Sequence, residues 1–157
     1  MRKISGFTLI EMMVVIFMIA FVSAFAVPNI MKWRSAAKLR GAAENLKGDL
    51  ELAKLKSIQE NGAVSIEFYG DRYQIYIDND KNLLPDAPEN LSRLSNKTLP
   101  AGVHIDMDAT GFAFGLKYTR FSGRGTAIQG TVVLVDSRGM QKFVTVSELG
   151  KITITNS

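Results

Sequence analysis

The sequence contains no cysteine, and this absence excludes disulfide bonds and thiolate metal sites while leaving the redox compartment open. Only one histidine is present, His104, so neither a second imidazole nor a thiol is available to pair with it. No nucleophile beside a base, no GxGxxG spacing and no P-loop lysine is visible. Nothing in the residue pattern therefore indicates an enzyme.

Long runs of like charge are also missing. The net charge is +4 over 157 residues, but no basic block is long enough to act as a nucleic-acid-binding arm. There is no internal repeat and no low-complexity tract, and the length suits one domain.

One long apolar run is present near the N-terminus. Residues 7–27 contain a single charge, Glu11, and as a helix they would span about 30 Å, one bilayer core. Arg2 and Lys3 precede the run, which predicts a cytoplasmic N-terminus and an external remainder. The alternatives are a buried core helix or a cleavable secretory signal ending among the small residues 23–26.

Glu11 is unusual inside such a run. A carboxylate in hydrocarbon costs roughly 2.5–3.5 kcal/mol, so it normally has a partner. The alternative is a side chain that reaches the membrane surface or becomes protonated.

A second helical pattern follows over residues 31–60. Its apolar positions repeat at three and four residues: Leu39, Ala43, Leu46, Leu50 and Ala53. We expect this stripe to pack on a sheet, to be widened by Leu52, Leu55 and Ile58, and to end at Asn61-Gly62.

Beyond Gly62 the apolar period changes to two, which predicts strands. The stretch "AVSIEFYGDRYQIYID" indicates a hairpin around Gly70-Asp71. Further predicted strands are "GVHIDM", "GFAFGLKY", "GTVVLVD", "MQKFVTVS" and "KITIT". One long helix followed by antiparallel strands predicts an α+β fold.

The N-terminal residues carry a family resemblance. The stretch "RKISGFTLIEMMVV" resembles the class III leader of type IV pilins and type II secretion pseudopilins. The resemblance implies cleavage between Gly6 and Phe7 by prepilin peptidase and N-methylation of Phe7. It also implies a helix kink at Pro28, and a role for Glu11 in pairing with the N-terminal amine of a neighbouring subunit.

The strand region narrows this resemblance. The stretch "FSGRGTAIQGTVVLVDSRGMQKFVTVSELGKITI" is similar to the C-terminal part of the GspH/FimT group of minor pilins and pseudopilins. The pilin fold so implied has a cleaved leader (1–6), a transmembrane and filament-core helix (7–30), an amphipathic continuation (31–60) and a periplasmic β-rich domain (61–157).

That resemblance also implies a structural subunit of a type II secretion pseudopilus or a type IV pilus. Its expected partners are other subunits, prepilin peptidase, the inner-membrane assembly platform and the lipid bilayer.

We expect no cofactor, with a calcium ion as the one alternative, because an acidic stretch matches part of a calcium-loop template. Its oxygen donors occupy positions 1, 3, 5, 9 and 12 of the template: Asp78, Asp80, Asn82, Asp86 and Glu89. However, Leu83 replaces the usual glycine, and Pro85 and Pro88 interrupt the loop. A solvated turn rich in Asp and Asn explains the same residues.

Two weaker patterns remain. An alternating strand would place His104, Asp106 and Asp108 on one face, as a cation site or simply as a solvent-facing strand.

Some FimT-like pilins capture DNA through a "GRxR" stretch, where this chain has "GKIT" with the single basic residue Lys151. Four more basic residues are candidates for a DNA-binding patch: Arg120, Arg124, Arg138 and Lys142. Solvated turn charges are the alternative, and we expect DNA binding to be weak.

Overall fold

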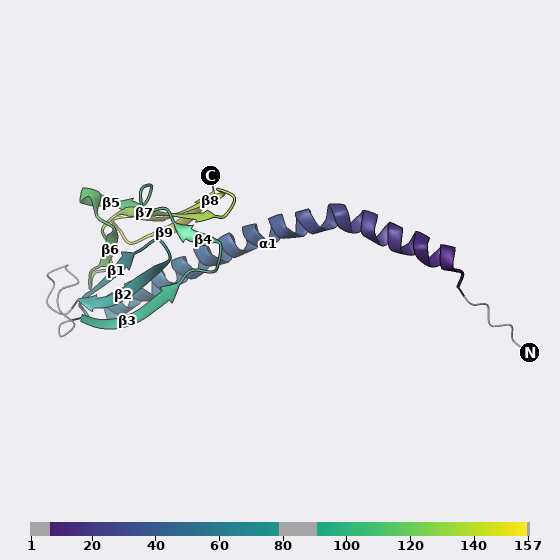
Figure 1. Ribbon diagram of the computed structural model, residues 1–157. Helices are drawn as coiled ribbons and strands as arrows, with labels where there is room; N and C mark the ends of the chain where they lie inside the picture. Colours follow the sequence, from purple (N-terminus) through teal and green to yellow (C-terminus); the bar gives the residue numbers. More distant parts are fainter. Residues whose placement is uncertain (1–6, 79–90, 157) are drawn as a thin grey trace, which may run out of the picture. The chain divides into compact units, whose positions relative to one another are not determined.

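The computed structural model describes residues 7–78 and 91–156, without the side chains at 26–28, 78 and 91–94. Within this part, one long helix precedes nine strands (Figure 1). The chain forms two compact units that divide between Arg34 and Ser35.

Helix α1 (Leu9–Gln59) contributes its second half to the unit Ser35–Ser157. All five residues of the predicted stripe are buried there, which confirms the packing face. The predicted widening by Leu52, Leu55 and Ile58 is wrong, because these side chains are exposed. They project from sides of the helix that no sheet covers, whereas Ala42 and Ser57 complete the buried face.

The helix ends where the sequence predicts. Asn61 adopts the left-handed conformation, with φ of 47°. The Asn61 amide donates to the carbonyl of Ile58 at 3.2 Å, and the Gly62 amide donates to the carbonyl of Ser57 at 3.1 Å. These two bonds form a Schellman motif, in which carbonyls of the last turn gain partners and the chain turns into the first strand.

The first sheet, sheet A, has the strand order β3-β2-β1-β6, all antiparallel. Its strands are β1 (Ala63–Phe68), β2 (Arg72–Asp78), β3 (Leu91–Thr98) and β6 (Tyr118–Phe121). β1 and β2 form the predicted hairpin, closed by Gly70-Asp71, with Phe68 paired to Tyr73. Their alternation directs Val64, Ile66 and Phe68 into the core.

The second sheet, sheet B, has the order β4-β7-β8-β9, and β5 also pairs with β7. Its strands are β4 (Val103–Ile105), β5 (Gly111–Phe112), β7 (Gly130–Asp136), β8 (Gln141–Val146) and β9 (Ile152–Asn156). The last three form an antiparallel meander, as their alternating patterns predict.

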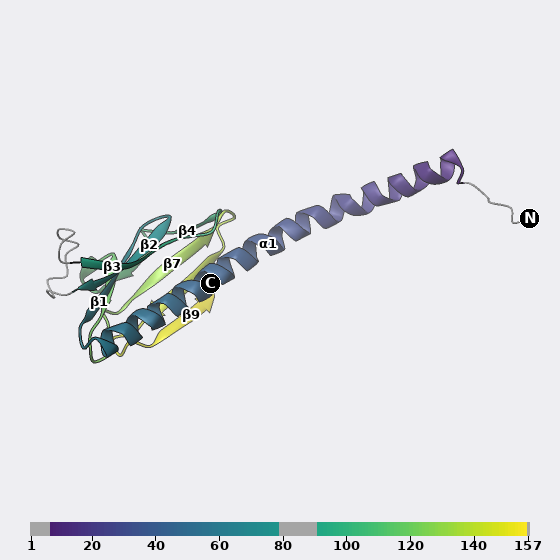
Figure 2. The ribbon, with the colours of Figure 1, turned by 90° about the horizontal axis from the view of Figure 1, so that it is seen from below.

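Both sheets pack on the second half of α1 and share one core (Figures 1 and 2). Phe68 of sheet A stacks on Phe112 of sheet B, with ring centroids 5.4 Å apart. The Tyr73 hydroxyl donates to Asp49 of α1 at 2.5 Å, and burial together with this bond raises the pKa of Tyr73. The phenol therefore remains a donor that joins sheet A to the helix.

The predicted strand "GFAFGLKY" is wrong. After the two residues of β5, a short 3₁₀ turn (Ala113–Gly115) reverses the chain, and β6 starts only at Tyr118. Phe114 and Gly115 both have positive φ, 66° and 72°. Two successive residues in the left-handed conformation reverse the chain tightly. Gly115 adopts this conformation easily, so the turn forms despite the strand propensity of the neighbouring phenylalanines.

Gly150 gives a test of the packing between two turns. It has φ of 68°, and a Cβ there would lie 2.2 Å from the carbonyl oxygen of Gly125. We expect Gly150→Ala to destabilise the fold by about 2–4 kcal/mol, combining left-handed strain with overpacking. Gly139→Ala is the matched control, because Gly139 has φ of 83° and nothing within 4 Å of the new Cβ. Chemical denaturation of both variants measures the difference, and equal losses would contradict the packing argument.

Candidate functional site

The N-terminal end of α1 carries the predicted assembly residue Glu11. Thr8 precedes the helix, and its hydroxyl accepts a hydrogen bond from the Glu11 amide at 3.3 Å. A threonine followed three residues later by glutamate is a capping-box pattern, which satisfies free amides at a helix start. Glu11 also lies in the first turn, where the helix dipole favours negative charge. The sequence analysis missed this local role, although "TLIE" contains the signal.

The other predicted processing and assembly residues are only partly visible. Phe7 is exposed and immediately precedes Thr8. Gly6 lies outside the described residues, and Pro28 is described only as backbone within α1. Their roles in cleavage and in kinking stay predictions.

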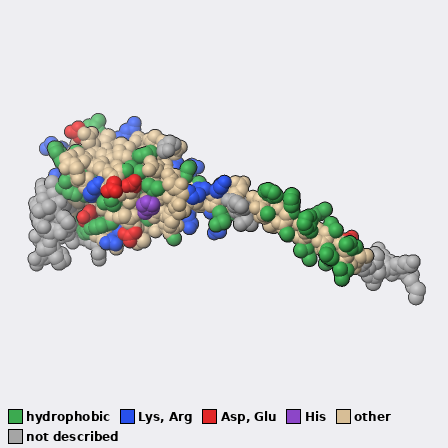
Figure 3. Space-filling view, turned by 45° about the horizontal axis from the view of Figure 1, so that its top comes forward, with side chains coloured by type: hydrophobic (Ala, Val, Ile, Leu, Met, Phe, Trp, Pro, Cys, Tyr) green, Lys and Arg blue, Asp and Glu red, His purple; other side chains and the backbone are tan. Residues whose placement is uncertain are grey.

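The first part of α1 is apolar and exposed. It contains a window long and apolar enough to cross a membrane, and none of that window is buried within the chain. Figure 3 shows hydrophobic side chains covering this part of the helix. A core helix of a soluble protein would be buried, so the structure does not support that alternative.

A buried carboxylate lies where α1 enters the second unit. Asp136, at the end of β7, accepts a hydrogen bond from the Ser35 hydroxyl at 2.7 Å. It also accepts bonds from the amides of Arg138 and Met140 at 2.9 Å, and the Arg138 guanidinium lies 3.1 Å away. Burial opposes ionisation of Asp136, but these hydrogen bonds outweigh it and lower its pKa to about 2. Ser35 is thereby tied to the β7–β8 turn.

The predicted calcium residues cannot be compared with the fold. Asp78 ends β2, without a described side chain, and Asp80, Asn82, Asp86 and Glu89 lie outside the described residues. Within residues 7–78 and 91–156, no group of three acidic or histidine side chains is placed to hold a metal.

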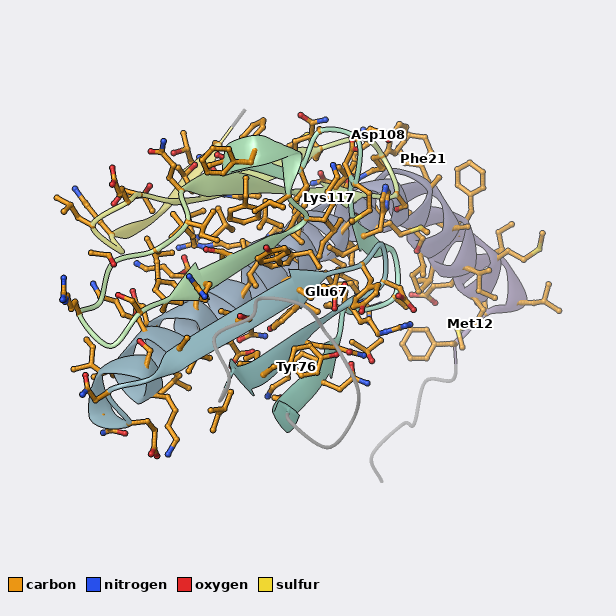
Figure 4. All side chains as sticks on the ribbon, turned by 90° about the vertical axis from the view of Figure 1, so that its left-hand side faces the viewer. Met12, Phe21, Glu67, Tyr76, Asp108 and Lys117 are labelled. Carbon is orange, nitrogen blue, oxygen red and sulfur yellow. The ribbon has the colours of Figure 1, made fainter. Side chains whose placement is uncertain are left out.

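The predicted alignment of His104, Asp106 and Asp108 on one strand face is wrong. β4 ends at Ile105, and Asp106 begins a turn in which its carboxylate accepts hydrogen bonds from the amides of Asp108 and Ala109, each at 3.0 Å. Lys117 donates to the carbonyls of Met107 and Thr110, which closes this turn (Figure 4). The Asp106 carboxylate therefore has a structural role in the turn.

The five basic residues considered for DNA binding divide between two ends of the second unit. Arg138 lies in the β7–β8 turn and is paired with Asp136, and Lys142 is near the start of β8. Lys151 follows the β8–β9 turn at the other end, where Gly150 packs on the loop containing Arg124. Arg120 and Arg124 line a common pocket of about 470 Å³ with Asn61 and Thr126. The five residues therefore do not form one continuous patch.

Comparison with known proteins gives two family matches. The family described as type II transport protein GspH matches residues 42–150, and the prokaryotic N-terminal methylation motif matches residues 1–27. No curated protein sequence matches the chain. The methylation motif and the exposed apolar helix fit a membrane-anchored protein.

Solved structures share the fold at low identity. The minor pseudopilin EpsH from the type 2 secretion system of Vibrio cholerae is 12% identical with a TM-score of 0.60, and the match covers 76% of this chain and 97% of that one. The type IV minor pilin FimU of Pseudomonas aeruginosa is 17% identical with a TM-score of 0.57, covering 78% and 92%. These matches confirm the predicted pilin fold, and the sequence match over residues 42–150 confirms the predicted group. The chain belongs to the GspH family of type II transport proteins.

Proposed function

We propose that this chain is a structural minor subunit, held in the inner membrane by the first part of α1 until it joins a type II secretion pseudopilus or a type IV pilus. The observation that carries the proposal is the exposed apolar helix with one carboxylate in its first turn, continuous with a folded unit.

The exposed helix needs an apolar environment. Its large side chains include Leu9, Phe17 and Phe25, each at least 70% exposed. Contiguous apolar surface of this extent is unfavourable in water, and a lipid bilayer covers it. In a filament, neighbouring helices of the same kind would replace the lipid through close packing. The same surface therefore serves the subunit before and after assembly.

The remaining partners follow from the family membership and the leader. Prepilin peptidase would remove residues 1–6, and the inner-membrane assembly platform would transfer the subunit into the filament. The basic residues Arg2 and Lys3 favour a cytoplasmic leader, with the globular unit in the periplasm. EpsH belongs to a secretion system and FimU is a type IV pilin, so the shared fold supports both assemblies equally.

The processing step gives the direct test. In cells containing prepilin peptidase, we expect the mature chain to begin at N-methylated Phe7, which intact-mass measurement on membrane-extracted protein detects. The control is expression without the peptidase, where residues 1–6 should remain. A chain that still begins at Met1 when the peptidase is present, or one cut after Ala26 as a secretory signal, would contradict the proposal.

A further inference from the structure

Basic residues without acidic neighbours follow the apolar segment. Between Glu11 and Glu44 the sequence contains no acidic residue, while four basic residues occur from 32 to 40: Lys32, Arg34, Lys38 and Arg40. All four are exposed along α1. Trp33 lies among them and is 72% exposed. Tryptophan flanked by basic residues at the end of an apolar helix is typical of the polar layer of a membrane.

The length of the chain places Ser35 near that layer. Seven residues, 28–34, separate the predicted hydrocarbon segment from Ser35, and as part of α1 they rise about 10 Å. The polar layer on each side of a bilayer is of similar thickness, roughly 5–8 Å. Ser35 therefore lies within about one Debye length of charged headgroups at physiological salt.

Contacts within the second unit bring further residues close to Ser35. Ser35 is bonded to Asp136, and Lys38 donates to the carbonyl of Ala101 at 3.1 Å. The β7–β8 turn that follows Asp136 presents Arg138 and Met140, the latter 56% exposed. The acidic residue of this turn, Asp136, is buried and paired with Arg138. We call the exposed residues Lys38, Arg138 and Met140 the Ser35 face.

We propose that the Ser35 face binds the anionic headgroups of the bilayer that the chain spans. Basic side chains near a membrane surface are attracted to anionic lipid, and the exposed Met140 contributes apolar contact. The inference rests on the membrane anchoring in the proposed function. Its consequence is that the globular unit stays against the membrane until assembly breaks the contact.

The absence of cysteine allows a clean measurement on the full chain. Met140→Cys supplies a single site for an environment-sensitive fluorophore, and Leu149→Cys supplies a matched exposed site in the β8–β9 turn at the other end of sheet B. Each labelled chain is placed in nanodiscs of phosphatidylcholine with or without phosphatidylglycerol. Phosphatidylglycerol should reduce acrylamide quenching at Met140 by roughly half, an effect that high salt removes. The probe at Leu149 should not change.

Charge variants identify the surface. Lys38→Gln with Arg138→Gln should abolish the protection at Met140, whereas Arg124→Gln with Lys151→Gln removes the same charge elsewhere and should preserve it. Circular dichroism confirms that each variant is folded. Equal quenching of the Met140 probe in both lipids, or equal loss in both double variants, would overturn the proposal. Protection that appears only when another pilin subunit is added would assign the face to a protein partner and would also overturn it.

Trp33 separates failure of this inference from failure of the proposed function. It is the only tryptophan in the chain, so its quenching by brominated lipids reports the depth of this segment without labelling. A chain that fails to enter nanodiscs, or an unquenched Trp33, would contradict the membrane anchoring itself. Normal quenching of Trp33 with an unprotected Met140 would contradict only the binding of the Ser35 face.

Discussion

Glu11→Gln is expected to reduce incorporation into filaments strongly while leaving membrane insertion and the start of α1 intact. Glutamine serves a capping box as well as glutamate does, so the contact pattern with Thr8 is retained and only the charge is lost. If Glu11 pairs with the amine of a neighbouring Phe7 in an apolar environment, losing the pair costs about 3 kcal/mol, and incorporation falls roughly 100-fold.

The measurement compares sheared filament fractions with membrane fractions by immunoblot. Thr8→Ala is the matched control, because it removes the cap but keeps the carboxylate, and it should reduce incorporation only slightly. If Glu11→Gln assembles normally while Thr8→Ala does not, Glu11 acts through helix capping and the pairing hypothesis is wrong.

Asp136→Ala is expected to destabilise the second unit by about 4 kcal/mol, because it removes a buried acceptor and leaves several partly buried donors unpaired. The Ser35 hydroxyl, two backbone amides and the Arg138 guanidinium all lose their bonds. Asp136→Asn keeps one acceptor oxygen for the turn amides and should lose about 2 kcal/mol. Denaturation of the full chain in detergent, followed by circular dichroism, measures both values.

The same carboxylate sets a dependence on pH. The pKa of Asp136 is about 2 in the folded chain against an ordinary value of 3.8, so the folded state favours the ionised form. This preference stabilises the fold fully above about pH 4 and is lost as the pH falls towards 2. The stability difference between the wild type and Asp136→Asn should therefore shrink over that interval. A difference that stays constant from neutral pH to pH 2 would contradict the ionic role.

Asp71→Asn is the control for this set. Asp71 also pairs with a nearby arginine, Arg72, at 3.3 Å, but its side chain is 72% exposed whereas that of Asp136 is fully buried. An exposed pair contributes about 0.2–1 kcal/mol, so this variant should change stability little at any pH.

The sequence predicts the helix well because local rules decide it. The stripe from Leu39 to Ala53 and the end at Asn61 depend on spacing and on turn chemistry, and both are confirmed. The exposure of Leu52 and Leu55 follows instead from which sides of the helix the sheets leave uncovered. The spacing of apolar residues along a helix does not predict which of its sides a sheet will cover.

Alternation of apolar residues predicts strands only where it is clear. The sequence indicates no strand at β3 (Leu91–Thr98), because "LSRLSNKT" is mostly polar and the strand lies at the edge of sheet A. The hydrogen bond between Asp136 and Ser35 joins residues 101 positions apart, so no local sequence pattern predicts it. Glu11, by contrast, is conspicuous in the sequence both as the single charge of the apolar run and as part of the leader pattern.

The interleaving of the two sheets has a consequence for biogenesis. The chain passes from sheet A to β4 and β5 of sheet B, returns to sheet A as β6, and ends in β7–β9. The buried side of α1, including Leu46 and Leu50, packs in a core that needs Val144, Val146 and Ile152 from the last two strands. In the proposed orientation the N-terminus stays in the cytoplasm and the residues after the apolar segment cross the membrane in chain order, so the core face of α1 would stay uncovered until β9 emerges. During that interval the subunit would depend on fast translocation or a chaperone for protection from proteolysis.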